Sequence, residues 1–117
     1  FDPQTQRAVD QLLNAFRAQP YATPSVADSE KAVGADVLAA LIEQGVLVKV
    51  NSDVLFLKET YDEMVARVTS FIRDNGSITV AQVRDMFQAS RKYALGLMEH
   101  LDEKRVTRRQ GDVRVMR

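Results

Sequence analysis

The fold is decided by the stretch that runs Ala89-Ser-Arg-Lys-Tyr-Ala-Leu-Gly-Leu-Met-Glu-His-Leu-Asp-Glu-Lys-Arg-Val-Thr-Arg-Arg-Gln-Gly-Asp-Val-Arg-Val-Met-Arg117. Its first half predicts a helix, because Ala94, Leu97, Met98 and Leu101 recur at helical spacing and form one apolar face. Its second half predicts a β-hairpin. Here Val106 to Arg109 and Val113 to Met116 flank the turn Gln110-Gly111-Asp112. Basic residues gather at the start of the helix and again around the turn.

Two further helices are predicted just before this stretch. Met64, Val65, Val68, Phe71 and Ile72 give one buried face to a helix from Tyr61 to Asp74, which ends at Asn75-Gly76. After the link Ser77-Ile78, the spacing of Thr79 and Gln82 is that of a capping box at the start of a second helix. Ser90 is the expected N-cap of the third.

The first half of the chain has the same order of elements. Asp2 and Pro3 start a helix that should end at Ala18, and Thr23-Pro24 predicts the start of a second helix that runs to about Val33. The third helix has the apolar face Val37, Leu38, Leu41 and Ile42 and is ended by Gly45 as a left-handed C-cap. Val46 to Val50 and Val54 to Leu57 then predict a hairpin across Asn51-Ser52-Asp53.

The two halves are therefore a repeat that is weak in identity and consistent in pattern. Aligning them pairs Leu41 with Leu101 and Val46 with Val106. Three helices and a terminal hairpin in about 57 residues are typical of the winged-helix variant of helix-turn-helix. We expect a mostly α fold with short β-hairpins (α+β), made of two tandem winged-helix domains, residues 1–59 and 60–117, joined at Lys58–Thr60.

Charge distinguishes the two halves, although the net charge of the chain is zero. Residues 1–60 hold five basic and eight acidic side chains, whereas residues 61–117 hold 11 and 8. The second half therefore carries +3 and the first −3, which predicts a polyanion partner for the second half only.

Composition excludes several classes of function. The chain has no cysteine and one histidine, so disulfides and thiolate–metal sites are excluded and a metal centre or histidine-based triad is not expected. No phosphate-cradling loop or nucleophile–base pattern is present, and no apolar run is long enough to span a membrane. Glu99, Asp102 and Glu103 are expected to be ordinary surface acids and His100 to be solvated. We expect no enzyme activity and no cofactor, in a monomeric piece of a larger cytosolic protein that opens Phe1-Asp2-Pro3 without an initiator Met.

The candidate site is formed by the two basic spots. The first turn of the third helix of the second half leaves backbone N–H groups unpaired at the positive end of the helix dipole, where a phosphate is favoured. Arg side chains on the hairpin can bind phosphate or a guanine edge with two hydrogen bonds, and Tyr93 offers a ring on which an unpaired base can stack. The site residues are expected to be Ser90, Arg91, Lys92, Tyr93, Arg108, Arg109, Gln110, Gly111 and Arg114.

Three functions compete for this surface. An RNA-hairpin binder, a winged-helix DNA-binding regulator and a winged-helix protein-interaction module all fit the fold. The exposed helix face that a duplex reader would insert contains Glu99 and Glu103, which would repel DNA and count against the second function. The chemistry of the residues alone indicates nucleic acid.

A family resemblance sharpens this choice. Residues Val83 to Asp102, with the block Ser90-Arg-Lys-Tyr-Ala94, and the later block Arg108-Arg-Gln-Gly-Asp-Val-Arg114, resemble the C-terminal end of the bacterial selenocysteine-specific elongation factors, the SelB family. The resemblance implies tandem winged helices behind a GTP-binding core, the last of which binds an mRNA hairpin, the selenocysteine insertion sequence, beside a UGA codon. It implies that the nine site residues face the loop end of that hairpin, and that the first winged helix is a spacer or support. Ribosome and selenocysteinyl-tRNA would be partners of the parent protein in the cytoplasm.

Overall fold

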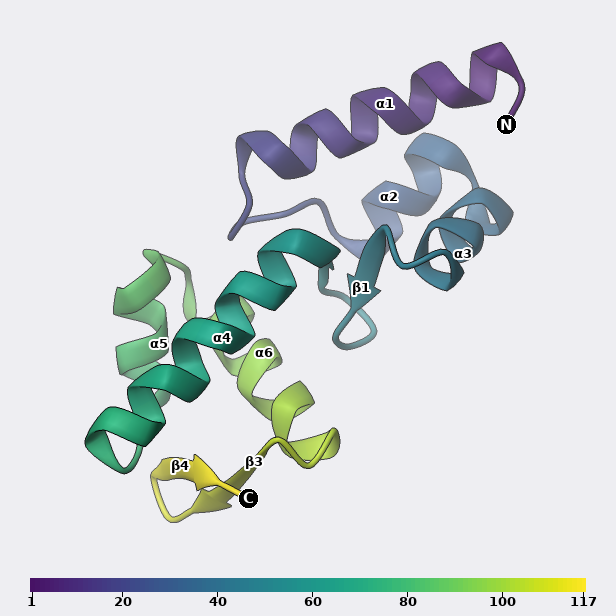
Figure 1. Ribbon diagram of the computed structural model, residues 1–117. Coiled ribbons are helices and arrows are strands. Elements are labelled where there is room, and N and C mark those ends of the chain that lie inside the picture. Colours follow the sequence, from purple (N-terminus) through teal and green to yellow (C-terminus); the bar gives the residue numbers. More distant parts are fainter. The chain divides into compact units, whose positions relative to one another are not determined.

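The computed structural model describes residues 1–117 and divides into two compact units, Phe1–Tyr61 and Asp62–Arg117. The first contains α1 (Pro3–Ala18), α2 (Val26–Val33), α3 (Ala35–Glu43), β1 (Leu47–Lys49) and β2 (Leu55–Leu57), and the second contains α5 (Val80–Phe87), α6 (Arg91–Glu103), β3 (Thr107–Gln110) and β4 (Val113–Met116) (Figure 1). Helix α4 (Lys58–Asn75) begins directly after β2 and supplies the first helix of the second unit. The expected joint is therefore the first turn of a helix. The predicted mostly α fold with two short hairpins is confirmed.

The core of the first unit is built from the apolar faces expected from the sequence. Val9, Leu12 and Phe16 of α1 pack with residues of α3 and with the inward side of the β1–β2 pair. Asp2 caps α1, because its carboxylate accepts a hydrogen bond from the Thr5 amide at 2.7 Å. That bond also lowers the pKa of the Asp2 carboxyl, since it stabilises the charged form.

Helix α2 begins two residues later than the sequence predicted. Ser25 is its N-cap and accepts a hydrogen bond from the Asp28 amide at 3.0 Å. Thr23 is instead buried, and its hydroxyl donates to the Leu55 carbonyl at 2.6 Å. Thr23 and Ser25 are both good caps by residue type. The contact with β2, which is remote in sequence, decides which of them starts the helix.

The turn between the third helix and the hairpin is the same in both units. In the first, the Val46 amide donates to Leu41 at 2.9 Å and the Gly45 amide to Ile42 at 3.1 Å, with Gly45 at φ 77°. This is a Schellman motif, and it confirms the predicted glycine C-cap. The second unit repeats it with 3.0 Å and 3.1 Å bonds at residues 106 and 105. The left-handed position there is occupied by Arg105, at φ 62°.

The second unit has its core between α4, α5, α6 and the hairpin. The predicted capping box at the start of α5 is confirmed, with Thr79 and Gln82 exchanging hydrogen bonds of 2.8 and 3.0 Å. Ile78, expected to be a link, pairs with Arg114 through two backbone hydrogen bonds and so forms an isolated β-bridge beside β4. The core of the second unit contains these fully buried side chains: Met64, Val68, Val83, Ala94, Leu97, Met98 and Leu101. No helix is long and apolar enough to cross a membrane.

Candidate nucleic-acid interface

A groove of about 490 Å³ lies on the second unit where the start of α5, one face of α6 and the β3–β4 hairpin meet. Arg91 lines it from the first turn of α6, and Arg109 lines it from the hairpin. The two basic spots of the sequence therefore border one hollow. The full lining is Thr79, Val80, Ala81, Arg91, Leu95, Glu99, Arg109, Asp112 and Arg114.

The face of α6 in this groove is set by helical spacing. Arg91, Leu95 and Glu99 are four residues apart and so lie in one row along the helix. Lys92 and Tyr93 lie outside that row and do not line the groove; the Lys92 ammonium instead sits 5.3 Å from the centre of the Tyr93 ring. Of the predicted site residues on α6, Arg91 is the one that lines the groove.

Ser90 occupies the N-cap position with extended backbone, and its side chain makes no capping hydrogen bond. The first turn of α6 therefore differs from those of α1, α2 and α5, whose N-cap side chains all accept a backbone amide. Ser90 and Arg91 are both exposed. The predicted N-cap position at Ser90 is confirmed. Because its side chain makes no capping hydrogen bond, the first backbone amides of α6 remain at the positive end of the helix dipole without that partner.

The register of the hairpin separates the predicted wing residues onto two faces. Arg109 pairs with Arg114 and Arg108 pairs with Val115. Because side chains alternate along a strand, Arg109 and Arg114 share the face toward the groove, while Arg108 and Gln110 lie on the other face. Gly111 forms the turn at φ 65°, and its carbonyl accepts a 3.0 Å hydrogen bond from Nε of Arg109.

Arg114, one of the predicted site residues, is buried at 4% exposure, although it belongs to a cluster of basic residues in the sequence. Its Nε contacts Asp102 Oδ2 at 3.2 Å, and the other carboxylate oxygen of Asp102 accepts a 2.7 Å hydrogen bond from the Thr107 hydroxyl. The expectation of Asp102 as an ordinary surface acid was wrong. The sequence reasoning also missed Thr107, which is fully buried.

His100 is likewise buried, at 6% exposure, although it was expected to be solvated. The reason is that α6 is the central helix of its unit. It is buried at Ala94, Gly96, Leu97, Met98, His100 and Leu101, a wider arc than the one apolar stripe visible in the sequence. His100 therefore belongs to the interior of the unit.

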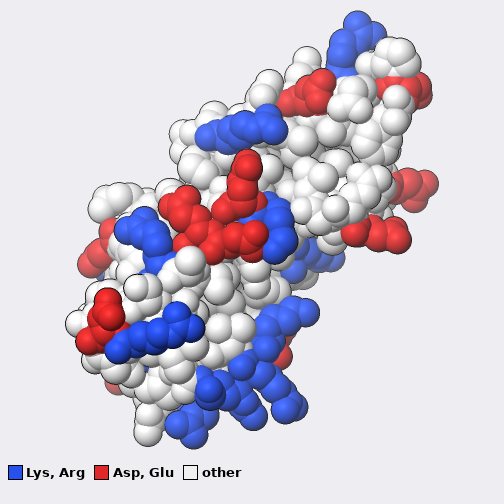
Figure 2. Space-filling view, in the orientation of Figure 1, with Lys and Arg blue, Asp and Glu red and all other residues white.

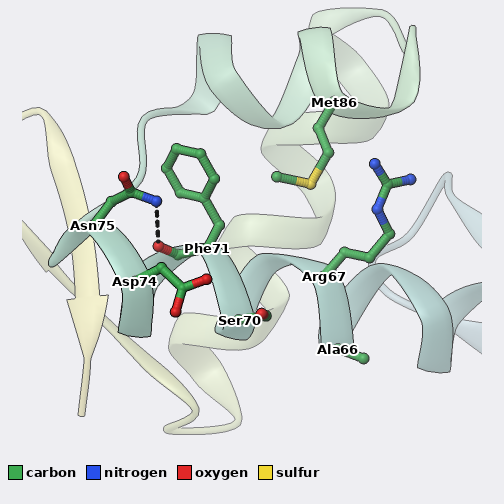
Figure 3. A pocket seen from close by; sticks show the side chains of 7 residues that line it. All are labelled: Ala66, Arg67, Ser70, Phe71, Asp74, Asn75 and Met86. Carbon is green, nitrogen blue, oxygen red and sulfur yellow. Dashed lines mark hydrogen bonds between the residues drawn. The ribbon is translucent and has the colours of Figure 1, made fainter.

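A second hollow, of about 360 Å³, lies between α4 and α5 (Figure 3). Phe71 and Met86 extend toward each other across it, and the Asn75 amide folds back to donate a 3.0 Å hydrogen bond to the Phe71 carbonyl. Its lining pairs the apolar side chains of Phe71 and Met86 with the polar side chains of Arg67, Ser70 and Asp74. No group of three or more His, Cys, Asp or Glu side chains that could hold a metal ion is present in the chain.

Basic side chains concentrate around the groove. Figure 2 shows Lys and Arg gathered over the end of α6 and the β3–β4 hairpin. The β1–β2 hairpin of the first unit has Val48 and Lys49 at the positions of Arg108 and Arg109, and Leu55 at that of Arg114. The cationic groove therefore belongs to the second copy of the repeat.

Comparison with known proteins finds a family match within the second half of the chain. The family model described as "Elongation factor SelB, winged helix" matches residues 70–116. The selenocysteine-specific elongation factor of Desulfomicrobium baculatum is 36% identical over 83 residues, which are 71% of this chain and 13% of that protein. The chain thus spans a small part of the curated relative that it matches.

Two solved structures share the fold over the whole chain. The mRNA-binding domain of elongation factor SelB from E. coli, solved in complex with SECIS RNA, has a TM-score of 0.77 at 24% identity and is covered to 99%. A bacterial selenocysteine-specific elongation factor EF-Sec has a TM-score of 0.77 at 14% identity, and 20% of it is covered. Sequence match and fold together place this chain in the winged-helix region of the SelB family of elongation factors.

Proposed function

We propose that this chain is the mRNA-hairpin-binding part of a selenocysteine-specific elongation factor, and that the groove of the second unit receives the tip of a hairpin of the selenocysteine insertion type. The observation that carries the proposal is the meeting of Arg91 and Arg109 in one groove. They come from two different elements; in the first unit Lys49 holds the position of Arg109, but α3 begins with Ala35 and Asp36 and has no basic residue in its first turn. Family membership supports the choice of RNA.

The chemistry of the groove suits a strand that is bent and partly unpaired. A phosphate at the start of α6 would meet the Arg91 guanidinium and backbone amides that Ser90 leaves uncapped. Arg109 would take a second phosphate or a base edge from the hairpin side. Glu99 and Asp112 also line the groove. They disfavour a polyanion at high density and favour exposed base edges, whose amino groups can donate to a carboxylate.

Roles outside the groove follow from the proposal. The ring of Tyr93, which is half-buried beside Lys92, would stack against a base that leaves the stem of the RNA hairpin. The first unit would be a spacer or support. Hairpin binding would hold the parent factor beside a UGA codon in the cytoplasm, with ribosome and selenocysteinyl-tRNA as partners of that parent. The segment itself would bind as a monomer and would need neither cofactor nor catalytic group.

Fluorescence anisotropy with three labelled ligands tests this function: an RNA hairpin with a bulged loop, the same sequence as DNA, and a fully paired RNA stem. The expected order is tightest binding to the RNA hairpin, since sequence-specific RNA readers bind unstacked loop bases. Equal affinity for all three would show a merely cationic surface. Preference for the DNA would favour a DNA-binding role.

A further inference from the structure

The contact between Asp102, Thr107 and Arg114 has a counterpart in the first unit with a different chemistry. When the two copies of the repeat are aligned through Val46 and Val106, Ile42 corresponds to Asp102 and Leu47 corresponds to Thr107. The strand registers make Leu55 the counterpart of Arg114. Leu47 and Leu55 are 1% and 0% exposed in the core of the first unit, with Ile42 packed against it. The second unit has exchanged all three apolar side chains for a carboxylate, a hydroxyl and a guanidinium.

Stability does not explain this exchange. A buried ion pair costs desolvation of both groups, and replacing one with apolar residues of similar size is often neutral or stabilising. The first unit shows that the fold accepts the apolar version at the same three positions. The exchange therefore points to a need that is specific to the second unit, which is also the unit with the cationic groove.

The register of the β3–β4 hairpin indicates which requirement of the second unit the three polar side chains meet. Arg109 and Arg114 are directly paired across β3 and β4 and share a face. Like charges opposite one another destabilise a strand pair. Asp102 removes this conflict by holding Arg114 through Nε at 3.2 Å, with its side chain 5% exposed. Arg109 is then left exposed on the groove side, bonded to its own turn at Gly111.

We propose that Asp102 and Thr107 are positioning residues for RNA binding: they anchor Arg114 and so fix the hairpin against α6 with Arg109 as its groove-facing cation. Thr107 contributes by holding the second oxygen of the Asp102 carboxylate at 2.7 Å. One oxygen of the Asp102 carboxylate is thereby held by a residue of β3, and the other oxygen is held by a residue of β4. This inference rests on the proposed function and assigns roles to two residues that need not touch RNA.

The test uses single substitutions in the full chain, with binding to the bulged RNA hairpin and to the fully paired stem measured by anisotropy. Asp102→Asn keeps the shape and removes the charge, and Thr107→Val replaces the hydroxyl with a methyl group. Both should weaken hairpin binding about tenfold, on the scale of one lost charge-assisted hydrogen bond, and reduce the preference for the hairpin over the stem. Thr107→Ser, which keeps the hydroxyl, should retain wild-type affinity.

Glu103→Gln is the matched electrostatic control, because Glu103 is the exposed neighbour of Asp102 and lies outside the network. Removal of an acid near a polyanion site should by charge alone leave binding equal or tighten it. The inference is overturned if Asp102→Asn behaves like Glu103→Gln, or if Thr107→Val and Thr107→Ser bind alike.

Two further outcomes are separated by design. If the wild-type chain shows no preference for the hairpin, the proposed function fails irrespective of the network. If thermal unfolding shows that Asp102→Asn is not folded at the assay temperature, the Thr107→Val and Thr107→Ser pair decides, since it changes one buried group without leaving a charge unpaired.

Discussion

Replacement of Arg109 by Ala, compared with replacement of Arg108 by Ala, tests the assignment of the two hairpin faces. The residues are neighbours in sequence and both are exposed, so an unstructured basic segment would use them equally. The register places Arg109 on the groove side, opposite Arg114, and Arg108 on the other side, opposite Val115. Only one of the two substitutions should therefore remove a direct contact.

The expected magnitudes follow from that geometry. A charged hydrogen bond to phosphate contributes about 1.5–3 kcal/mol, so Arg109→Ala should weaken hairpin binding about 10- to 150-fold. Arg108 would act on the groove only through solvent, where the Debye length is about 8 Å at physiological salt, and its loss should cost at most about 1 kcal/mol, roughly fivefold. Removal of one phosphate contact should also reduce the slope of log affinity against log salt by about 0.7–0.9.

Anisotropy titrations of the RNA hairpin at several salt concentrations measure both quantities. Lys49→Ala is the internal control, because Lys49 holds the position of Arg109 in the first unit and should leave affinity and slope unchanged. Equal losses for Arg108→Ala and Arg109→Ala would refute the two-faced hairpin. An equal loss for Lys49→Ala would refute the confinement of binding to the second unit.

Three further predictions concern stability and are checked by urea unfolding. Thr79→Ala should lower the free energy of unfolding by about 1 kcal/mol because it removes the capping box, whereas Ser90→Ala should change it by less than about 0.3 kcal/mol because the Ser90 side chain makes no capping bond. Arg105→Gly should raise the free energy of unfolding by about 0.5–1 kcal/mol. The left-handed conformation costs an arginine about 1–2 kcal/mol, and part of the gain from removing this cost is offset because glycine loses more conformational entropy on folding. Ser29→Ala should raise it by about 1 kcal/mol, because the Ser29 hydroxyl is fully buried without a hydrogen-bond partner. A fall in stability for either of the last two would contradict the structural reasoning.

Features encoded by a few neighbouring residues were predictable from the sequence. The capping box at Thr79 and the glycine C-cap at Gly45 depend on spacings of three or four residues, and both are confirmed. The order of three helices and a hairpin in each half was predictable for the same reason. Where two residues offered the same local chemistry, as Thr23 and Ser25 do at the start of α2, a hydrogen bond to a remote strand made the choice.

The buried network of Asp102, Thr107 and Arg114 could not be predicted from the type of any single residue in the sequence. Asp102 and Arg114 are 12 positions apart and each is of a type that is normally exposed. They meet because the hairpin folds back so that β4 lies against the end of α6. A signal was present in the repeat: Ile42, Leu47 and Leu55 all change to polar residues in the second copy. A joint change of three core positions is a stronger indication of a buried network than any one charge.

Under the proposed function, the acids of the groove would let a chain of zero net charge select its ligand. Association driven by phosphates alone is strong but carries little sequence information. Glu99 and Asp112 share the groove with Arg91 and Arg109, so a ligand gains affinity only if it places phosphate at the two cations and base donors at the two carboxylates. A regular stem presents phosphates at both kinds of position and is disfavoured at the acids. A hairpin tip, where the backbone turns and bases leave the stack, can satisfy both, and for this reason we expect the bulged hairpin to bind more tightly than its paired stem.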